Sequence, residues 1–353
     1  MIIQPHAATV LITGGAGYIG SHISFFLAQR GYDVVILDTL NHNQTVPLCF
    51  RQKVSHLPGT ITLIKKDFAD KQTLQTIFSK HVVQAVIHCA ALIEVGDSVK
   101  NPRAFYRNNV VKTVQLLETM LEYNVKKIIF SSSCAVYGTP QYLPLTESHT
   151  KNPISPYGNN KYIIEMLLQD FHTAYDLEFV SLRYFNAAGA FPEQNLGEQH
   201  NPETHLIPLL LRAAYEKKPF YIFGTDYNTK DGTCIRDFLH VRDLVDAHHK
   251  ALNHLIKKMP SDYFNLGTGH GYSVKECIDM VQRITGLEIK TIIKKRRAGD
   301  PPVLVANRSK AYNILDWKPH YSDLEYIIKT ANQFYKIYAP KNSQPLQTNP
   351  QTR

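Results

Sequence analysis

The chain has no run of apolar residues approaching the roughly 18 needed to cross a bilayer, so the sequence predicts no membrane-spanning segment. Its five cysteines are odd in number, scattered and without a CxxC pair, which excludes a disulfide framework and is typical of a protein of the reducing cytoplasm. The first residues, MIIQPHAATVLIT, lack a basic leader and a small-residue cleavage site, so we expect no signal peptide. Acidic residues are the scarcer charged type, 30 against 39 Lys and Arg. The resulting balance of +9 leaves nucleic acid, anionic ligands or only a basic surface as explanations.

The first half of the chain alternates between strand-like and helix-like segments. Strand-length apolar runs occur at 8–13, 34–37, 61–64, 82–88, 127–130 and 179–182, with helical patterns at 19–30, 73–80, 102–123 and 156–175. Continuous apolar runs are typical of strands buried on both faces of a parallel sheet. The pattern therefore predicts a doubly wound, Rossmann-like α/β domain over residues 8–187.

The second half is more mixed. We expect a smaller α/β domain over 188–338 that shares some segments with the first, and no internal repeat is visible. Its predicted elements are helices at 206–217, 241–257 and 274–285 and strands at 220–223 and 288–294. The tail 340–353 contains Pro, Gln, Asn and Thr with almost nothing apolar, so we expect it to be disordered.

A glycine-rich turn follows the first predicted strand. Gly14, Gly17 and Gly20 have the GxxGxxG spacing and open a helix, where glycine permits a sharp turn and close approach to a pyrophosphate. Asp38 ends the second strand, and no Arg follows it through Asn43. A carboxylate there binds ribose hydroxyls and repels a 2′-phosphate, so the sequence predicts NAD rather than NADP.

A second motif carries acid–base chemistry. Tyr157 and Lys161 are i,i+4 neighbours at the start of a predicted helix, and Ser133 ends a strand at the carboxyl edge of the sheet. A phenol with an ordinary pKa of about 10 is a poor base at neutral pH unless positive charge favours the phenolate. Lys161 and a nicotinamide ring would supply that charge, so Tyr157 is the candidate base, with Ser133 as second hydrogen-bond partner of the reacting oxygen.

The motifs GGAGYIGSH, FSSSCAVYG, SPYGNNK, LRYFNAAGA, DGTCIRDFLHV, FNLGTG and GDPPVLVA follow one another between Val10 and Tyr335. In this order the chain resembles the extended short-chain dehydrogenase/reductases and, within them, the UDP-glucose 4-epimerase branch. The resemblance implies an NAD-binding domain over 8–187 and a UDP-sugar-binding domain over 188–338. It also implies tightly bound NAD that is regenerated in each cycle, and a UDP-hexose substrate inverted at C4 through a transient 4-keto-hexose. A cytoplasmic homodimer without a metal is implied as well.

The same resemblance assigns two sets of residues. The expected cofactor contacts are Gly14, Gly17, Tyr18, Ile19 and Gly20 at the pyrophosphate, Asp38, Thr39, Leu40, Asn41, His42 and Asn43 at the adenosine ribose, Asp67 and Phe68 at the adenine, and Cys89, Ala90, Ala91, Asn108, Ser133, Tyr157, Lys161, Tyr184 and Phe185 along the rest. The expected substrate contacts are Ser133, Tyr157 and Leu304 around the hexose, Asn186 on the diphosphate, His205, Leu206, Tyr221 and Phe223 around the uracil, and Arg236, Arg297 and Asp300 on phosphates and ribose.

Several positions depart from the branch's pattern. His205 stands where relatives often carry Asn, Phe238 where they carry Tyr, and Ile93 where some carry a Lys. At position 304, some relatives carry a bulky Tyr and others a small residue, and the side chain of Leu304 is intermediate in size. A 4-epimerase acting on UDP-N-acetylglucosamine and UDP-N-acetylgalactosamine, or on a UDP-pentose, therefore stays an alternative.

Rival functions find less support. A nucleotide-sugar dehydratase needs an acid and a base after the strand-end residue, where this chain has Cys134 and Ala135. An NAD-dependent reductase that releases its cofactor stays open. No RNA-binding module accompanies the basic cluster 294–297, so we expect no nucleic-acid partner. The 16 histidines form no HExxH motif, and His248 and His249 point about 100° apart on a helix, so no metal site is predicted.

Overall fold

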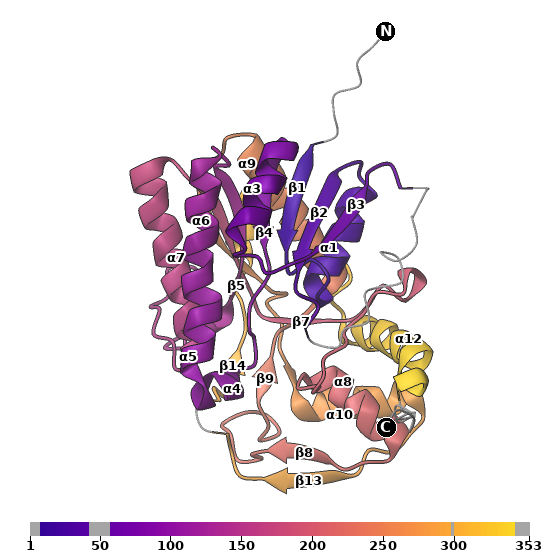
Figure 1. Cartoon of the computed structure of the whole chain (residues 1–353). Helices are drawn as coiled ribbons and strands as arrows, with labels where there is room; N and C mark the ends of the chain where they lie inside the picture. Colours follow the sequence, from indigo (N-terminus) through magenta and orange to yellow (C-terminus); the bar gives the residue numbers. More distant parts are fainter. Residues whose placement is uncertain (1–7, 42–56, 298–299, 343–353) are drawn as a thin grey trace, which may run out of the picture.

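The centre of the molecule is a seven-stranded sheet in the order β11-β6-β5-β4-β1-β2-β3, with all pairs parallel (Figure 1). The structure is a computed structural model that describes residues 8–41, 57–297 and 300–342. The strands of this sheet are β1 (Thr9–Thr13), β2 (Asp33–Asp38), β3 (Ile61–Lys65), β4 (Val83–His88), β5 (Lys127–Ser133), β6 (Glu178–Tyr184) and β11 (Asp262–Leu266). The predicted doubly wound α/β fold is confirmed. His42, Asn43 and the tail from residue 343 lie outside the described residues.

Helices cover both faces of this sheet, so strands such as β1 are buried on both sides. One face packs against α1 (Tyr18–Ala28), α9 (Val241–Ile256) and α11 (Ser309–Leu315). The other face packs against α3 (Lys71–Lys80), α6 (Lys112–Glu122) and α7 (Pro156–Tyr175). Strand order reverses direction between β1 and β4, and at such a switch point the carboxyl ends of the strands form a ligand-binding crevice.

The predicted single helix over 102–123 is interrupted. It consists of α5 (Pro102–Phe105), a π-helical segment (Tyr106–Val111) and α6, with a short α4 (Val95–Lys100) before it. Asn109 in the π segment donates to the carbonyl oxygen of Leu92 and accepts from the Leu92 N–H, which holds the wider turn against the loop after β4. The segment also carries Asn108, a predicted cofactor residue, and π-bulges are frequent at functional sites.

The remaining elements form a smaller unit below the sheet in Figure 1. Its core joins α8 (Leu206–Glu216), α10 (Val274–Thr285) and α12 (Leu324–Asn342). Short strands complete it: β8 (Phe220–Phe223) with β13 (Thr291–Lys294), β9 (Ile235–Arg236) with β12 (Tyr272–Ser273) and β14 (Val303–Leu304), and β7 (Asn186–Ala188) with β10 (Phe238–His240). Two 3-10 turns, Cys134–Val136 and Pro192–Gln194, lie in loops.

Two segments bear on the predicted division at residue 188, which stays a prediction. β11 and α9 come from beyond it, yet β11 pairs with β6 and α9 packs on the large sheet.

α12 continues through residues 340–342, where we expected the disordered tail to begin. Buried Ile327, Ile328 and Phe334 anchor this helix, and it continues beyond them to Asn342. Within the described ranges, no helix is both long and apolar enough to span a membrane.

Candidate active site

The glycine turn after β1 leaves no room for side chains at two of its positions. Gly14 has a φ of +68°, and a Cβ there would lie 2.7 Å from backbone atoms of Ala90, just beyond β4. A Cβ on Gly20 would lie 2.1 Å from the carbonyl oxygen of Gly14, because α1 packs directly on the turn. Only glycine fits at both positions. The turn therefore brings bare backbone to the switch point between β1 and β4, as a dinucleotide pyrophosphate requires.

The first turn of α1 suits an anion. Gly17 caps the helix without a side-chain hydrogen bond, so the helix offers its free N–H groups at this end. The side chain of Tyr18 points away, because its hydroxyl donates to the carbonyl oxygen of Gly189 at 2.8 Å. The side chain of Ile19 packs against the apolar core. The pyrophosphate contact of Tyr18 and Ile19 stays a prediction. Because both side chains are engaged elsewhere, the backbone N–H groups of these residues would have to make it.

Asp38 lies where a ribose would meet the turn. Its Oδ2 accepts from the Ala16 N–H at 3.1 Å, and its Oδ1 accepts from the Leu40 N–H at 2.9 Å. The carboxylate therefore fixes the glycine turn and also shapes the loop through Leu40, whose φ is +56°. Thr39 and Asn41 flank Leu40 at the same edge of the sheet, and their contact with a ribose stays a prediction.

The expected adenine side contains a polar bridge that sequence reasoning missed. Lys112 Nζ donates to Asp67 Oδ2 at 2.5 Å and to Asn108 Oδ1 at 3.2 Å, which joins the loop after β3 to the π segment. Phe68 is buried, with its ring 5.0 Å from that of His88. The predicted adenine contact of Phe68 would therefore have to come from its backbone and not from its ring.

Ser133 and Tyr157 meet at the carboxyl edge of β5. α7 begins after Ser155, whose Oγ accepts from the Gly158 N–H at 3.1 Å, and Pro156 occupies its first turn. A Cβ on Gly158 would lie 2.6 Å from the carbonyl oxygen of Ala135, so the absent side chain lets the helix approach the turn after β5. Ser133 and Tyr157 are both 9% exposed, and the Ser133 hydroxyl is near enough to the Tyr157 phenol to lower its pKa. The structure thus brings together the predicted base and its hydrogen-bond partner.

Lys161 lies beneath this pair. Its Nζ donates to the carbonyl oxygen of Ser131 at 2.7 Å and lies 5.7 Å from the centroid of the Tyr157 ring. Burial lowers the pKa of Lys161 to about 8, against the opposing effects of Cys89 and Glu165. Burial also raises the pKa of Tyr157 well above its usual value, and the Ser133 hydrogen bond offsets this only in part. In the chain by itself the phenol therefore keeps its proton at neutral pH.

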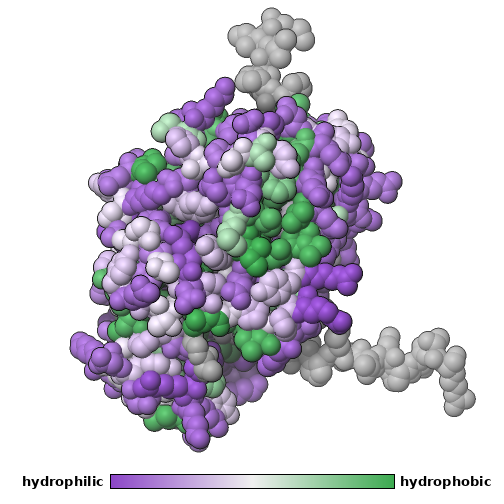
Figure 2. Space-filling view, turned by 90° about the vertical axis from the view of Figure 1, so that its left-hand side faces the viewer, coloured by the Kyte–Doolittle hydropathy of each residue, from purple (hydrophilic) through white to green (hydrophobic). Residues whose placement is uncertain are grey.

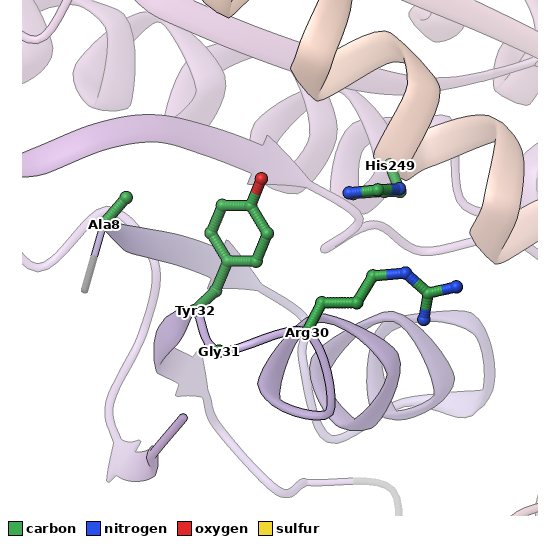
Figure 3. Close-up of a pocket in the computed structure, with 5 residues that line it drawn as sticks. All are labelled: Ala8, Arg30, Gly31, Tyr32 and His249. Atoms are coloured by element: carbon green, nitrogen blue, oxygen red, sulfur yellow. The ribbon is translucent and has the colours of Figure 1, made fainter. Parts of the chain in front are cut away.

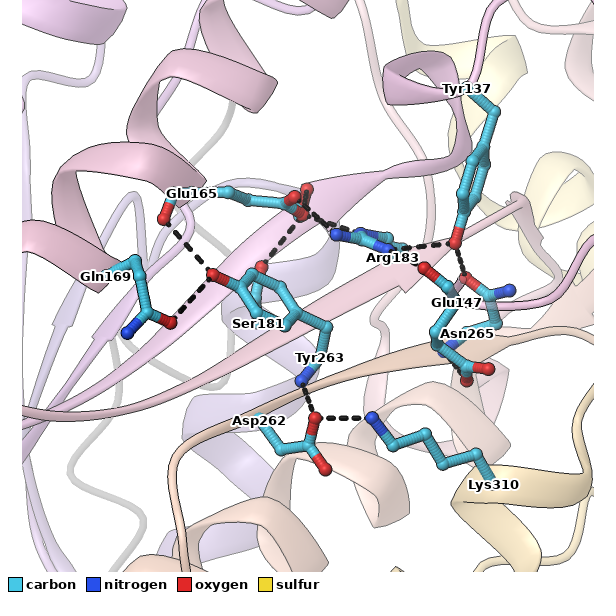
Figure 4. Close-up of polar contacts among 11 residues, drawn as sticks. Tyr137, Glu147, Glu165, Gln169, Ser181, Arg183, Asp262, Tyr263, Asn265 and Lys310 are labelled. Atoms are coloured by element: carbon cyan, nitrogen blue, oxygen red, sulfur yellow. Dashed lines mark hydrogen bonds and ion pairs between the residues drawn. The ribbon is translucent and has the colours of Figure 1, made fainter. Parts of the chain in front are cut away.

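A buried ion pair supports the catalytic helix from behind (Figure 4). Arg183 of β6 makes two bonds to Glu165 of α7, Nε to Oε1 at 2.8 Å and Nη2 to Oε2 at 2.7 Å, and both side chains are 2% exposed. Ser132 Oγ also donates to Glu165 Oε1 at 2.7 Å, while Arg183 Nη1 donates to the Tyr137 hydroxyl at 3.0 Å. Glu165 lies one turn after Lys161, so this network fixes α7 against β5 and β6. Sequence reasoning missed it, since its members lie on separate elements.

The other predicted cofactor residues line the end of β4 and the end of β6. Ser131 Oγ donates to Cys89 Sγ at 3.2 Å, and burial raises the pKa of the Cys89 thiol to about 11, so the thiol is neutral. Ala90 and Ala91 follow Cys89 and are half-buried. Tyr184 is half-buried at the end of β6, and Phe185 is buried with Cys134 in a cluster that Leu304 joins.

Seven of the predicted substrate residues form two groups. In the first, Arg236 Nη2 pairs with Asp300 Oδ1, and Arg236 Nη1 donates to the carbonyl oxygen of Pro301 at 2.9 Å. Leu304 lies opposite Arg236 in the β9–β14 pairing. Asn186 is held nearby, because its Nδ2 donates to the carbonyl oxygen of Asp237 at 3.0 Å. The predicted clamp of Arg236 and Asp300 is therefore an ion pair in this structure.

The second group lies on the β8–β13 pair. The Arg297 guanidinium carbon stands 3.9 Å from the centroid of the Phe223 ring, and Tyr221 is 43% exposed on the same strand. An exposed aromatic beside a stacked guanidinium suits a planar base and its phosphates.

A further cluster joins residues that sequence reasoning did not connect. His205 caps α8 just before Leu206, and its Nδ1 lies 2.6 Å from Glu198 Oε1. His200 Nδ1 lies 3.2 Å from the same oxygen, and Glu203 Oε1 is within 3.8 Å of both histidines. The available signal was the alternation Glu198-x-His200-x-x-Glu203-x-His205 within eight residues.

An open pocket of about 400 Å³ lies at the opposite end of the sheet (Figure 3). Ala8, Arg30, Gly31, Tyr32 and His249 line it, where β1 and β2 begin. Since Gly14, Ser133 and Asp38 lie where their strands end, this pocket is separate from the candidate active site.

Comparisons with known proteins identify the family of this chain. Residues 10–267 match the model of the NAD dependent epimerase/dehydratase family. A UDP-glucose 4-epimerase of Halalkalibacterium halodurans is 46% identical over 328 residues, which are 93% of this chain and 95% of that protein.

Solved structures show the same fold. The crystal structure of a UDP-glucose 4-epimerase from Brucella ovis in complex with NAD has a TM-score of 0.85 at 43% identity, over 92% of this chain and 98% of that one. A UDP-glucose 4-epimerase from Bifidobacterium longum in complex with NAD+ and UDP has a TM-score of 0.88 at 38% identity, over 94% and 99%.

Proposed function

The chain belongs to the NAD-dependent epimerase/dehydratase family, and from that premise we propose that it interconverts UDP-glucose and UDP-galactose by inverting C4 of the hexose. It is an epimerase, and its cofactor is NAD. The observation that carries the proposal is the meeting of Ser133, Tyr157 and Lys161 at the carboxyl edge of β5, beside a glycine turn built for a pyrophosphate.

Each of these three residues has a distinct task. When bound, NAD supplies a hydride acceptor and donor and a positively charged ring. Tyr157 Oη takes the proton of the 4-hydroxyl and later returns it, as general base and then acid. Ser133 Oγ orients the reacting oxygen through a hydrogen bond. Lys161 places its ammonium below the Tyr157 ring, where it favours the phenolate.

The substrate side holds the nucleotide more firmly than the sugar. Arg236 and Arg297 bring two guanidinium groups, which suit a diphosphate through bidentate hydrogen bonds. Asp300, now paired with Arg236, would bond a ribose hydroxyl when the diphosphate takes over the guanidinium. Asn186, and Leu304 opposite Arg236, lie at the inner end of this group. Firm binding of UDP alone leaves the hexose free to present either face.

A second substrate class is favoured by Leu304. This half-buried side chain stands opposite Arg236 and packs with Cys134 and Phe185. It fills less space than a Tyr, so UDP-N-acetylhexosamines are the second candidates. A UDP-pentose would leave room unfilled at the same end of the site.

We further propose that the chain forms a homodimer through the side built from α4, the π segment and α7. Val99, Val111 and Met166 of these elements are 62%, 50% and 43% exposed, and Figure 2 shows apolar surface gathered on this side of the molecule. Light scattering on the eluting protein should give twice the mass of the chain. Val111→Glu should yield monomers, whereas Val82→Glu, at an exposed site beyond α3, should not. A monomeric wild type would contradict the proposal.

A coupled assay tests the activity. UDP-galactose, UDP-N-acetylgalactosamine and UDP-arabinose are given separately to the purified protein, and each epimer is quantified together with NADH. We expect UDP-glucose to form fastest, without net reduction of added NAD. Steady accumulation of NADH would instead indicate a dehydrogenase.

A further inference from the structure

We propose that Glu198, His200, Glu203 and His205 bind one zinc ion that fastens the segment before α8. Their donor atoms, one from each side chain, all lie within 4.8 Å of one another. Two imidazole nitrogens and two carboxylate oxygens are a donor set that Zn²⁺ accepts in four-coordinate sites.

The spacing of the donors fits a tetrahedron. Zinc bonds of about 2.1 Å place tetrahedral ligand atoms about 3.4 Å apart. The four distances between a histidine Nδ1 and a glutamate Oε1 are 2.6, 3.2, 3.7 and 3.8 Å, which lie on both sides of this value. The closest pair, His205 with Glu198, would have to open by somewhat less than about 1 Å, and the widest separations within the 4.8 Å limit would have to close.

Three of the four side chains are sheltered, His205 is 46% exposed, and the site contains an unsatisfied donor. The side chains of Glu198, Glu203 and His200 are 7%, 11% and 13% exposed. His200 Nδ1 is inaccessible and makes no well-aligned hydrogen bond, although Glu198 Oε1 is 3.2 Å away. A buried polar atom without a proper hydrogen bond costs stability, and a metal ion bonded to it would remove that cost.

The filled site would carry no net charge, because one divalent ion and two neutral imidazoles balance the carboxylates of Glu198 and Glu203. Neither carboxylate would then be buried without a counter-charge.

The location indicates what the ion does. The segment between β7 and α8 is anchored by Leu196, which packs in the core that α1 shares. Phe191 of the same segment places its ring 4.9 Å from that of His22 in α1. The cluster thus stands between the helix of the glycine turn and α8, with Tyr18 and His22 as the titratable groups of α1 that Glu198 influences. A zinc ion here would order the loop that presents His205 and Leu206.

Zinc binding by the full-length chain tests the proposal. Protein stripped with EDTA is dialysed against ZnCl₂ at fixed pH, and bound metal is measured by mass spectrometry. We expect one ion per chain and a higher Tm with zinc than without. His200→Asn and Glu203→Gln should each weaken binding at least about tenfold, as the loss of a ligand does. His81→Ala, at an exposed histidine after α3, should bind as the wild type does.

Zinc X-ray absorption on the wild type keeps the test independent of how the variants fold. Four nitrogen or oxygen neighbours at about 2.0–2.1 Å, with the scattering of two imidazoles, are expected. Absence of stoichiometric zinc, or sulfur or six oxygen neighbours, would overturn the proposal. Equal affinity in the wild type and both ligand variants would overturn it as well.

Discussion

Gly158 and the carbonyl oxygen of Ala135 are so close that a Cβ on Gly158 would lie 2.6 Å from that oxygen. This approach sets the distance between the helix that carries Tyr157 and Lys161 and the strand end that carries Ser133. The catalytic geometry therefore depends on a residue that has no side chain.

Gly158→Ala should move α7 away from the turn after β5. We expect kcat to fall at least about tenfold, because a misplacement of catalytic groups by about 1 Å can lower the rate by about 100-fold. The free energy of unfolding should fall by about 1–3 kcal/mol. Gly96→Ala, where a Cβ would meet nothing within 4 Å, is the matched control. Steady-state kinetics and urea unfolding measure both effects, and an unchanged kcat in Gly158→Ala would contradict the link.

Activity should decline as the pH rises through about 8. Burial lowers the pKa of Lys161 to about 8, so its ammonium is fully present below this pH and lost above it. Loss of that charge removes support for the Tyr157 phenolate and lowers kcat. In Lys161→Met, kcat should be at least about 100-fold lower than in the wild type, and the decline of activity near pH 8 should disappear. A decline that persists unchanged in this variant would assign it to another group.

Glu165→Gln should destabilise the chain strongly. It leaves the buried Arg183 guanidinium without its carboxylate, a loss that typically costs about 3–5 kcal/mol. Replacing both partners, as Glu165→Leu with Arg183→Met, should cost less than the two single changes added together. Glu325→Gln removes an exposed carboxylate and serves as control. Additive costs in chemical denaturation would show that the pair does not act as a unit.

Leu304→Tyr should change substrate preference. The larger ring would fill the space opposite Arg236 and beside Cys134 and Phe185. We expect kcat/KM for UDP-N-acetylgalactosamine to fall about tenfold or more relative to that for UDP-galactose. Leu304→Met conserves volume and should leave the ratio unchanged. Equal effects of Leu304→Tyr on the two substrates would show that this position does not limit the 2-substituent.

Local patterns predicted much of the fold. The helix Pro156–Tyr175 was predicted to the residue, because Ser155 and Pro156 mark its start and Asp176 ends it in a left-handed conformation. The strand Phe220–Phe223 was also predicted to the residue. The π segment Tyr106–Val111 was not, since it shares the apolar spacing of the helices beside it.

Sequence spacing by itself revealed the parts of the site that lie on one element. The glycine turn and the Tyr157–Lys161 pair each lie on one element, so spacing revealed them. The hydrogen bond from Tyr18 to Gly189 joins residues 171 positions apart, and the Arg236–Asp300 pair joins residues 64 positions apart. Such contacts depend on how the smaller unit packs under the sheet, which no local pattern encodes.

The most direct test is the epimerase activity of Tyr157→Phe on UDP-galactose, measured on protein whose NAD content and circular dichroism match the wild type. The substitution removes the one hydroxyl proposed to carry the proton and keeps the buried ring. We expect kcat to fall by about 100-fold to 10,000-fold with NAD still bound. Wild-type kcat in a folded, NAD-containing Tyr157→Phe protein would contradict the assignment of Tyr157 as the catalytic base.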